Sequence, residues 1–410
     1  MVSAYAELEE RMRGRLGGRD CLYVPSCRFG LYLALRHWCR PGGRVLMSPV
    51  NDDVIFFVVL AAGLRPVQAP LDPRDGSIDT AAVPESVWGG LSAVLTTNLY
   101  GNPDPAPELR ARCDESGIPL LEDAAHAIGS TAGGRPVGTW GEASVFSLSK
   151  HTGAKTGGFL TFADPALRGE LAAARDELLH PSRTSAELAY LVRPYAEATV
   201  RGLRLVKAAH ATLRLLGQQE REEIRMPLRA DELKQALAGA PGLAPFHSWV
   251  RVDMHDYRLG PGAARLRRTG RLLARLDATL AAHRAGTERL LASEWGGGTG
   301  TGTGGGTGLA GDAQPLFRVP LLVEDRDAAI AALARRRIVT GYLYDPPLDT
   351  YAGELFTDLS PAPEPAAWFA RHALPVDPRR APEVIETLRA AGAVRAEPPA
   401  VFDAGRGDRG

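Results

Sequence analysis

Three features are scarce or missing in this chain of 410 residues. It has only four cysteines, and its charges balance, with 48 lysines and arginines against 48 aspartates and glutamates. Its first 16 residues carry charges throughout and contain no apolar run of the kind found in signal peptides or membrane anchors. These absences predict a cytoplasmic protein without a disulfide scaffold. They argue against a membrane protein, and against a nucleic-acid-binding protein, which would need a basic surface.

The cysteines Cys21, Cys27, Cys39 and Cys113 have no metal-ligand spacing, so we expect reduced, mostly buried thiols and no metal site. What the chain does have is apolar residues, which make up 45% of it. That share allows a large core, and the length predicts two domains. The ligand is expected to be a small molecule.

Short apolar runs alternate with helical stretches between residues 44 and 162. The runs are RVLMS, RPVQA, SAVLTTNLY, IPLLED, ASVFSLS and GFLTF. This alternation predicts an α/β fold with a largely parallel sheet covered by helices. The segment PELRARCDESG has a helical composition, and Gly117 follows it where a helix C-cap belongs.

The second half of the chain has a different pattern. Residues 185–291 are rich in Ala, Leu and Arg and predict helices, and the Gly/Thr tract at 296–308 predicts a mobile loop. The later segments FRVPLLV, DRDAAIAALARRR and VIETLRAAG predict a small α/β C-terminal domain. We therefore expect a large domain over 1–250, with a helical insertion at about 180–250, and a small domain over 251–410.

The residues that can carry chemistry cluster between positions 120 and 162. Asp123 ends the run IPLL, and ligands of open α/β sheets bind at the carboxyl ends of strands. A carboxylate there can pair with a pyridinium nitrogen, although a lone aspartate would more often cap a helix. His126 follows three residues later and can share a face with Asp123, although a lone histidine is more often structural. The run ASVFSLS then places Ser147 and Lys150 at its end, before glycines that let the backbone approach a ring or phosphate.

The order of these motifs resembles the DegT/StrS family of pyridoxal-5'-phosphate (PLP)-dependent sugar aminotransferases. The resemblance rests on EDAAHAIG, GRPVGTWGEASVFSLSK and the GG seven residues beyond the lysine, with VPSCRFGLYLAL, RVLMSPV, AAGLRPV, LDPRDGSID, NLYGNP, DYRL and RHALPVD around them. It spans nearly the whole chain outside the insertion and the Gly/Thr tract. It implies a fold-type-I enzyme with a mostly parallel, seven-stranded type of sheet, working as a homodimer.

The resemblance also implies roles for single residues. Lys150 would hold PLP as a Schiff base and move the proton during the reaction, and Asp123 would pair with the ring nitrogen. Ala125 would pack on the ring face, His126 would contact the 3-oxygen, and Ser147 would hold the phosphate.

The phosphate is expected at the turn Ser26-Cys27-Arg28. Ser26 can cap the helix that begins there, and the free backbone N–H groups of the first turn would bind the phosphate. Asp256 stands where the family has an asparagine that reaches the partner's phosphate. A carboxylate there would repel the phosphate unless a cation such as Arg28 or Arg258 intervened.

Three departures from the family pattern leave alternatives open. Two residues fewer than usual separate Ser147 from Lys150, so Ser149 could share the phosphate. Asn51, Asp52 and Asp53 follow Ser48-Pro49 where the family has an aromatic that stacks on the ring. Lys155 competes with Lys150 as the covalent lysine, and the spacing to the glycine pair favours Lys150.

A basic segment in the insertion predicts one helix over about 194–216. Its cations lie on one side at helical spacing: Arg193, Arg201, Arg204, Lys207 and Arg214. Such a side is most often a solvated face. The alternative is a docking surface for an anionic substrate group or an acidic carrier protein.

Three functions compete for this sequence. The first is a PLP-dependent aminotransferase that acts on a keto sugar, cyclitol or other natural-product intermediate, with an amino acid such as glutamate as donor. The second is another PLP reaction, an elimination or carbon–carbon bond formation, on the same scaffold. The third is a non-catalytic sensor or accessory protein, which the missing aromatic and Asp256 favour and the set Asp123, His126 and Lys150 disfavours.

Overall fold

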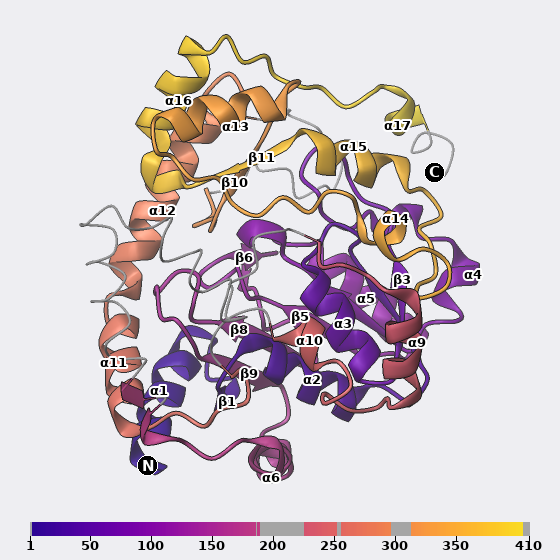
Figure 1. Ribbon diagram of the computed structural model, residues 1–410, viewed down its shortest axis with the longest axis vertical. Coiled ribbons are helices and arrows are strands. Elements are labelled where there is room, and N and C mark those ends of the chain that lie inside the picture. Colours follow the sequence, from indigo (N-terminus) through magenta and orange to yellow (C-terminus); the bar gives the residue numbers. More distant parts are fainter. Residues whose placement is uncertain (1, 186, 189–224, 252–255, 297–312, 405–410) are drawn as a thin grey trace.

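A seven-stranded sheet lies at the centre of the larger part of the molecule (Figure 1). The computed structural model describes residues 2–185, 187–188, 225–251, 256–296 and 313–404. The strand order is β1-β9-β8-β5-β4-β2-β3. The bounds are β1 Asp20–Val24, β2 Arg44–Met47, β3 Arg65–Gln68, β4 Ala93–Thr96, β5 Leu120–Asp123, β8 Ala143–Ser147 and β9 Gly158–Phe162.

All strands of this sheet run parallel except β9, which is antiparallel to its neighbours β1 and β8. The mostly parallel sheet predicted from the sequence is therefore confirmed, and the six predicted runs supply six of its strands. The seventh, β1, is the buried run DCLYV, which precedes the predicted series.

Helices cover both faces of the sheet, and neighbouring strand residues point into different cores. In β2, Val45 and Met47 belong to the core under α2 (Cys27–Trp38) and α3 (Asp53–Ala61). Leu46 between them belongs to the opposite core, under α4 (Glu85–Trp88), α5 (Ala106–Ser116) and α15 (Glu364–His372). This alternation is the period of two expected of a strand buried on both faces.

The C-terminal part has a core of its own. There β10 (Val319–Leu322) pairs antiparallel with β11 (Ala373–Val376), and α13 (Arg326–Arg335) and α16 (Ala381–Ala390) pack with them. The helix α12 (Leu276–Leu291) links this part to the large sheet, because Leu276 and Leu280 pack with α1 (Val2–Arg15) and α11 (Ala263–Leu273), while Leu290 packs in the C-terminal core (Figure 1).

The remaining described elements are short and peripheral. They are α6 Arg168–Leu178, α9 Ala230–Ala238, α10 His247–Val250, α14 Leu348–Ala352, α17 Val401–Ala404, and the two-stranded pair β6 Thr131–Ala132 and β7 Arg135–Pro136. No helix among the described residues is long and apolar enough to cross a membrane. The predicted basic helix at 194–216 and residues 297–308 of the Gly/Thr tract lie outside the described residues.

Two local predictions about helix ends are confirmed. Ser26 is the N-cap of α2, and its Oγ accepts a hydrogen bond from the Phe29 amide at 3.3 Å. Gly117 closes α5 in the left-handed conformation with a φ of 64°, which costs glycine little because it has no Cβ. All four cysteines are free, and three of them are buried.

Candidate active site

The carboxyl ends of the parallel strands open into one cavity of about 370 Å³. Loops after β1, β2, β4, β5 and β8 contribute to its wall, as expected for an open α/β sheet. The predicted site residues lie on it together: Ser26, Cys27, Arg28, Asp123, Ala125, His126, Ser147, Lys150 and Asp256. The wall also contains the competing lysine Lys155 and side chains with no predicted role, among them Thr97, Thr156, Tyr257, Tyr342 and Tyr344.

Asp123 is the buried last residue of β5, and it points into this cavity with a carboxylate that lacks a cationic hydrogen-bond partner among the described residues. Its Oδ1 accepts the Ala125 amide at 3.0 Å and lies 3.8 Å from the Cys27 Sγ. Burial raises the pKa of Asp123 to about 7. A cationic ring nitrogen placed here would restore the ionised form of this carboxylate.

Lys150 follows β8 and faces the same cavity. Its side chain is open to solvent only through the cavity, and burial lowers the pKa of Lys150 below its usual value. Among the charges, that of Asp52 opposes this shift most, followed by Cys27 and then Asp123. A lysine whose pKa is lowered in this way is closer to the neutral amine that can act as nucleophile or base.

His126 is held in a stack of aromatic rings. Its imidazole lies 5.2 Å from the Phe317 ring and 6.3 Å from the Tyr100 ring, both nearly parallel to it, and Tyr100 stacks on Tyr344 at 5.7 Å. Burial, and next the charge of Lys150, lower the pKa of His126 well below its usual value. His126 is therefore a neutral imidazole that can share one hydrogen bond with a ligand oxygen.

Another group of side chains on the cavity wall fits a phosphate. The amino end of α2 begins there at Cys27, and the hydroxyl of Thr156 is buried without a hydrogen-bond partner in the described structure. Ser147 and Ser149 also line this wall, with their Oγ atoms 2.9 Å apart, so the structure brings both serine candidates to the cavity. Together with Arg28 and Lys155 they supply the hydroxyl and cationic donors that a phosphate requires.

This donor set fits PLP. A buried carboxylate at Asp123 suits a ring nitrogen, a neutral His126 suits a ring oxygen, and a lysine with a lowered pKa suits the aldehyde carbon. The unsatisfied Thr156 hydroxyl beside a helix amino end suits the phosphate. Ala125, partly exposed on the wall between these groups, is small enough to let a flat ring approach.

A strained loop after β4 holds Asp123 in place, and no simple sequence signal revealed it. Asn98 and Tyr100 have left-handed backbones, with φ of 45° and 57°. The side-chain amide of Asn98 donates through Nδ2 to the backbone carbonyl oxygen of Asp123 at 3.0 Å. Asp104 fixes the loop, because its carboxylate accepts the backbone amides of Ile78, Thr97 and Asn98 at 2.9, 2.6 and 3.1 Å.

Asp256 lies on the cavity wall of its own chain, and its carboxylate is paired with a histidine. His180 Nδ1 lies 2.6 Å from its Oδ2, and the Arg258 amide donates to Oδ1 at 3.0 Å. Burial alone would raise the pKa of Asp256, but these two hydrogen bonds outweigh it and the pKa is lowered. Arg28 and Arg258, the two cations considered from the sequence, stand 5.5 and 5.6 Å from the Tyr257 ring.

Aromatic side chains reach the cavity from the C-terminal part of the chain. Tyr342 and Tyr344 lie on its wall, and the Lys150 Nζ is 5.7 Å from the Tyr342 ring and 5.6 Å from the Phe317 ring. The sequence YLYDPP carries this aromatic pair but does not say which distant strand ends it meets. The position after Ser48-Pro49, by contrast, supplies the carboxylate of Asp52 to the wall.

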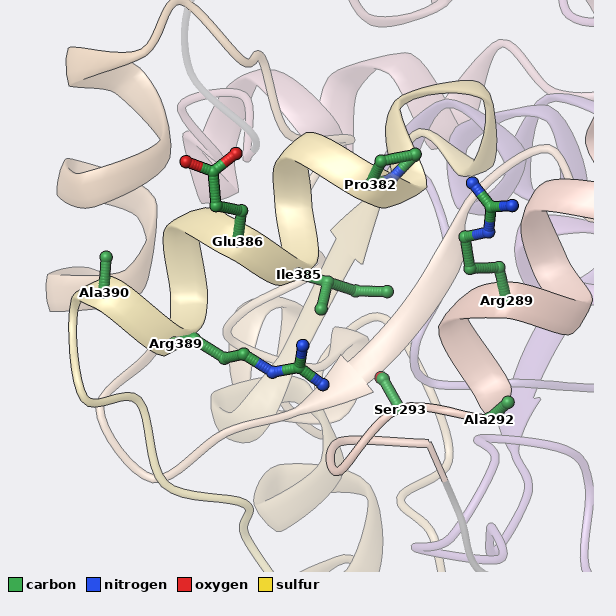
Figure 2. A pocket seen from close by; sticks show the side chains of 8 residues that line it. All are labelled: Arg289, Ala292, Ser293, Pro382, Ile385, Glu386, Arg389 and Ala390. Atoms are coloured by element: carbon green, nitrogen blue, oxygen red, sulfur yellow. The ribbon is translucent and has the colours of Figure 1, made fainter.

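A second hollow, of about 790 Å³, lies between the end of α12 and α16 (Figure 2). It is open at the surface, and two of its charged groups are paired. Arg389 forms two hydrogen bonds to Glu294 at 2.7 and 2.8 Å, and Glu386 pairs with Arg336 at 2.8 Å. The candidate active site is therefore the cavity at the strand ends, where groups with shifted pKa values converge.

Parts of the chain are similar to known proteins. Residues 3–269 match the model of the DegT/DnrJ/EryC1/StrS aminotransferase family. The L-glutamine:2-deoxy-scyllo-inosose aminotransferase of Streptoalloteichus tenebrarius is 38% identical over 143 residues, 35% of this chain and 34% of that protein. The alpha-methylserine aldolase of Variovorax paradoxus is 30% identical over 193 residues, 44% of this chain and 43% of that protein. The chain thus spans less than half the length of these curated relatives.

The fold has solved counterparts. The E. coli GDP-4-keto-6-deoxy-D-mannose-3-dehydratase with bound hydrated PLP superposes with a TM-score of 0.64 over 95% of this chain and 91% of that one, at 17% identity. The predicted fold-type-I architecture is confirmed by this likeness and by the sheet.

Proposed function

The chain belongs to the DegT/DnrJ/EryC1/StrS aminotransferase family, and from this we propose that it is a PLP-dependent aminotransferase that forms an amine on a keto sugar, a cyclitol or another natural-product intermediate. The donor would be an amino acid such as glutamate. One observation carries the proposal: Asp123, His126 and Lys150 line a single cavity whose wall also carries hydroxyl and cationic groups suited to a phosphate.

PLP, when bound, supplies a conjugated ring that accepts the electron pair released at the substrate carbon. The protein's own groups do the rest. Asp123, at the end of β5, holds a positive charge at the ring nitrogen, and the cationic partner keeps the carboxylate ionised despite its burial. His126 would orient the ring through its 3-oxygen, and the amino end of α2 that Ser26 caps would hold the phosphate together with Ser147, Ser149 and Thr156.

Lys150 has two tasks in this proposal. Its Nζ would hold the cofactor, and as a free amine it would move the proton at the substrate carbon. The lowered pKa of Lys150 supports both tasks, since the neutral form is the reactive one. The Phe317 and Tyr342 rings near Nζ restrict water around this nitrogen.

The acceptor class is inferred from relatives. The name of the Streptoalloteichus protein specifies a cyclitol ketone as acceptor and glutamine as donor. A cyclitol or sugar also suits the wall of the cavity opposite Ala125, which is lined by the hydroxyl and aromatic groups of Thr97, Tyr342 and Tyr344.

The proposal is tested by finding the covalent lysine. Borohydride reduction of the purified holoenzyme, followed by peptide mapping, is expected to place a pyridoxyl group on Lys150. Lys150→Ala should lose both this adduct and turnover, because one amine performs both tasks. Lys155→Ala should keep the adduct on Lys150. A pyridoxyl group on Lys155, or on no lysine, would show that the site is assigned wrongly.

A second candidate is cleavage of a β-hydroxy-α-amino acid, and the likeness to alpha-methylserine aldolase favours it. Both reactions begin with an amino acid at Lys150, so the same residues serve either one. The two are separated by the products. Incubation with L-glutamate yields 2-oxoglutarate in the first case, and incubation with α-methylserine releases formaldehyde in the second.

A further inference from the structure

Asp52 is a carboxylate on the cavity wall that the functional assignment leaves without a role. It follows Ser48-Pro49 at the end of β2 and is the N-cap of α3, where its Oδ1 accepts the Val54 amide at 3.0 Å. Every residue of α3 is buried, so this helix cannot shift to carry the carboxylate away. The amino end of the helix also favours the ionised form of Asp52.

The charge of Asp52 acts on the reacting groups of the site. It raises the pKa of Lys150 more than any other charge does, and it also raises the pKa values of Asp123 and His126. Asp123 faces Lys150 as well, but its carboxylate is needed at the ring nitrogen. Asp52 and the His180-paired Asp256 are the other carboxylates of the described wall, and of these two it is the charge of Asp52 that acts on Lys150.

We propose that Asp52 is the ammonium-binding carboxylate of this site: it receives the protonated amine of the amino-acid substrate beside Lys150 and stabilises positive charge on the nitrogen held there. The inference rests on the proposed function. A primary amine reaches the site as an ammonium ion at neutral pH, and burial in the cavity disfavours that charge unless an anion compensates it. Asp52 supplies the anion on the wall where the resemblance would place a ring-stacking aromatic.

The first test measures charge at Lys150 without turnover. The holoenzymes of the wild type, Asp52→Ser and Asp52→Asn are titrated with acid and base while the visible absorbance of the bound cofactor is followed. Serine and asparagine are both good N-caps, so α3 keeps its cap while the charge is lost. Because Asp52 raises the pKa of Lys150, its removal should move the spectral transition to lower pH, by roughly one unit for an ion pair at the edge of a cavity.

The other titratable or charged groups around Lys150 are unchanged in these variants. They are Cys27 at the start of α2, Asp123 and His126 after β5, and Arg318 before β10. The matched control is Asp325→Ser, which also exchanges an aspartate N-cap, at α13, away from the cavity. This control should leave the transition where it is. A transition that stays at the wild-type pH in both Asp52 variants would overturn the inference and reduce Asp52 to a helix cap.

The second test measures binding of the amine. In a stopped-flow reaction with L-glutamate, Asp52→Ser should raise the apparent dissociation constant about tenfold, the counterpart of a one-unit pKa change, and change the limiting rate less. An unchanged dissociation constant would contradict the inference. If the wild type reacts with no amino acid, the proposed function fails, while the spectral titration still decides whether Asp52 places charge on the Lys150 nitrogen.

Discussion

Asp123 shows how much of this site depends on the surroundings of one residue. In the protein without a bound cation its pKa is about 7, because burial outweighs its hydrogen bonds. A carboxylate with this pKa is stabilised strongly by a positive ring nitrogen, and the same contact keeps that nitrogen protonated. Each partner therefore stabilises the charge of the other. The position of Asp123 at the end of β5, facing the cavity, allows this contact.

Asp123→Asn is expected to retain the cofactor and to lose most of the activity. The amide cannot hold a proton on the ring nitrogen, so the barrier should rise by about 3 kcal/mol or more, which is at least a hundredfold in kcat. Steady-state kinetics measures this, with the absorbance of the bound cofactor as evidence that the site is occupied. Asp114→Asn, on the exposed face of α5, is the control. A kcat near that of the wild type would remove Asp123 from the ring nitrogen.

At the scale of elements, the loop after β4 has a strained backbone, and the Asp104 carboxylate is one of the groups that hold it. Two residues other than glycine adopt left-handed backbones there, which costs of order 1 kcal/mol each unless neighbouring contacts hold them. Asp104 provides those contacts through three backbone amides, and its burial makes them strong. The loop in turn positions Asp123 through Asn98.

Asp104→Asn should destabilise this loop although the two side chains have nearly the same shape. Its Oδ2 accepts the amides of Thr97 and Asn98, so an NH₂ group in that place would face two donors. We expect a loss of about 2–4 kcal/mol in the free energy of unfolding by urea, together with weaker PLP binding. Asp164→Asn is the control, since Asp164 caps an exposed turn. Unchanged stability with unchanged PLP affinity would show that Asp104 does not hold the loop.

For the whole molecule, we propose a large PLP-binding domain over 1–250, a small domain over 251–410 and a two-fold dimer. The separate core of the C-terminal part supports the division. Two large apolar side chains are exposed in this part of the described surface: Tyr342, on the cavity wall, is 51% exposed, and Val339 is 80% exposed. Such exposure is expected of a face that a second copy covers. A closed two-fold dimer would bury one such face on each copy.

Sedimentation velocity at micromolar concentration is expected to give a mass near 88 kDa, twice the 43.8 kDa of the chain. The holoenzyme should be measured with and without 1 M salt, because an apolar interface persists when ion pairs are screened. A monomer under both conditions would contradict the proposed dimer.

The sequence by itself determined the features that depend on neighbouring residues. Alternating apolar runs predicted six strands of the sheet, and Ser26 and Gly117 marked helix ends. Asp123, His126 and Lys150 were predicted as site residues because they follow apolar runs and stand in motifs that resemble those of a known family. Only the tertiary structure decided what each of these groups meets. Asn98 on the Asp123 carbonyl, His180 on Asp256, and Tyr342 near Lys150 join segments far apart in the chain. Such contacts arise from packing in three dimensions, and so does the burial that sets the pKa values of Asp123 and Lys150, which no local pattern of residues encodes.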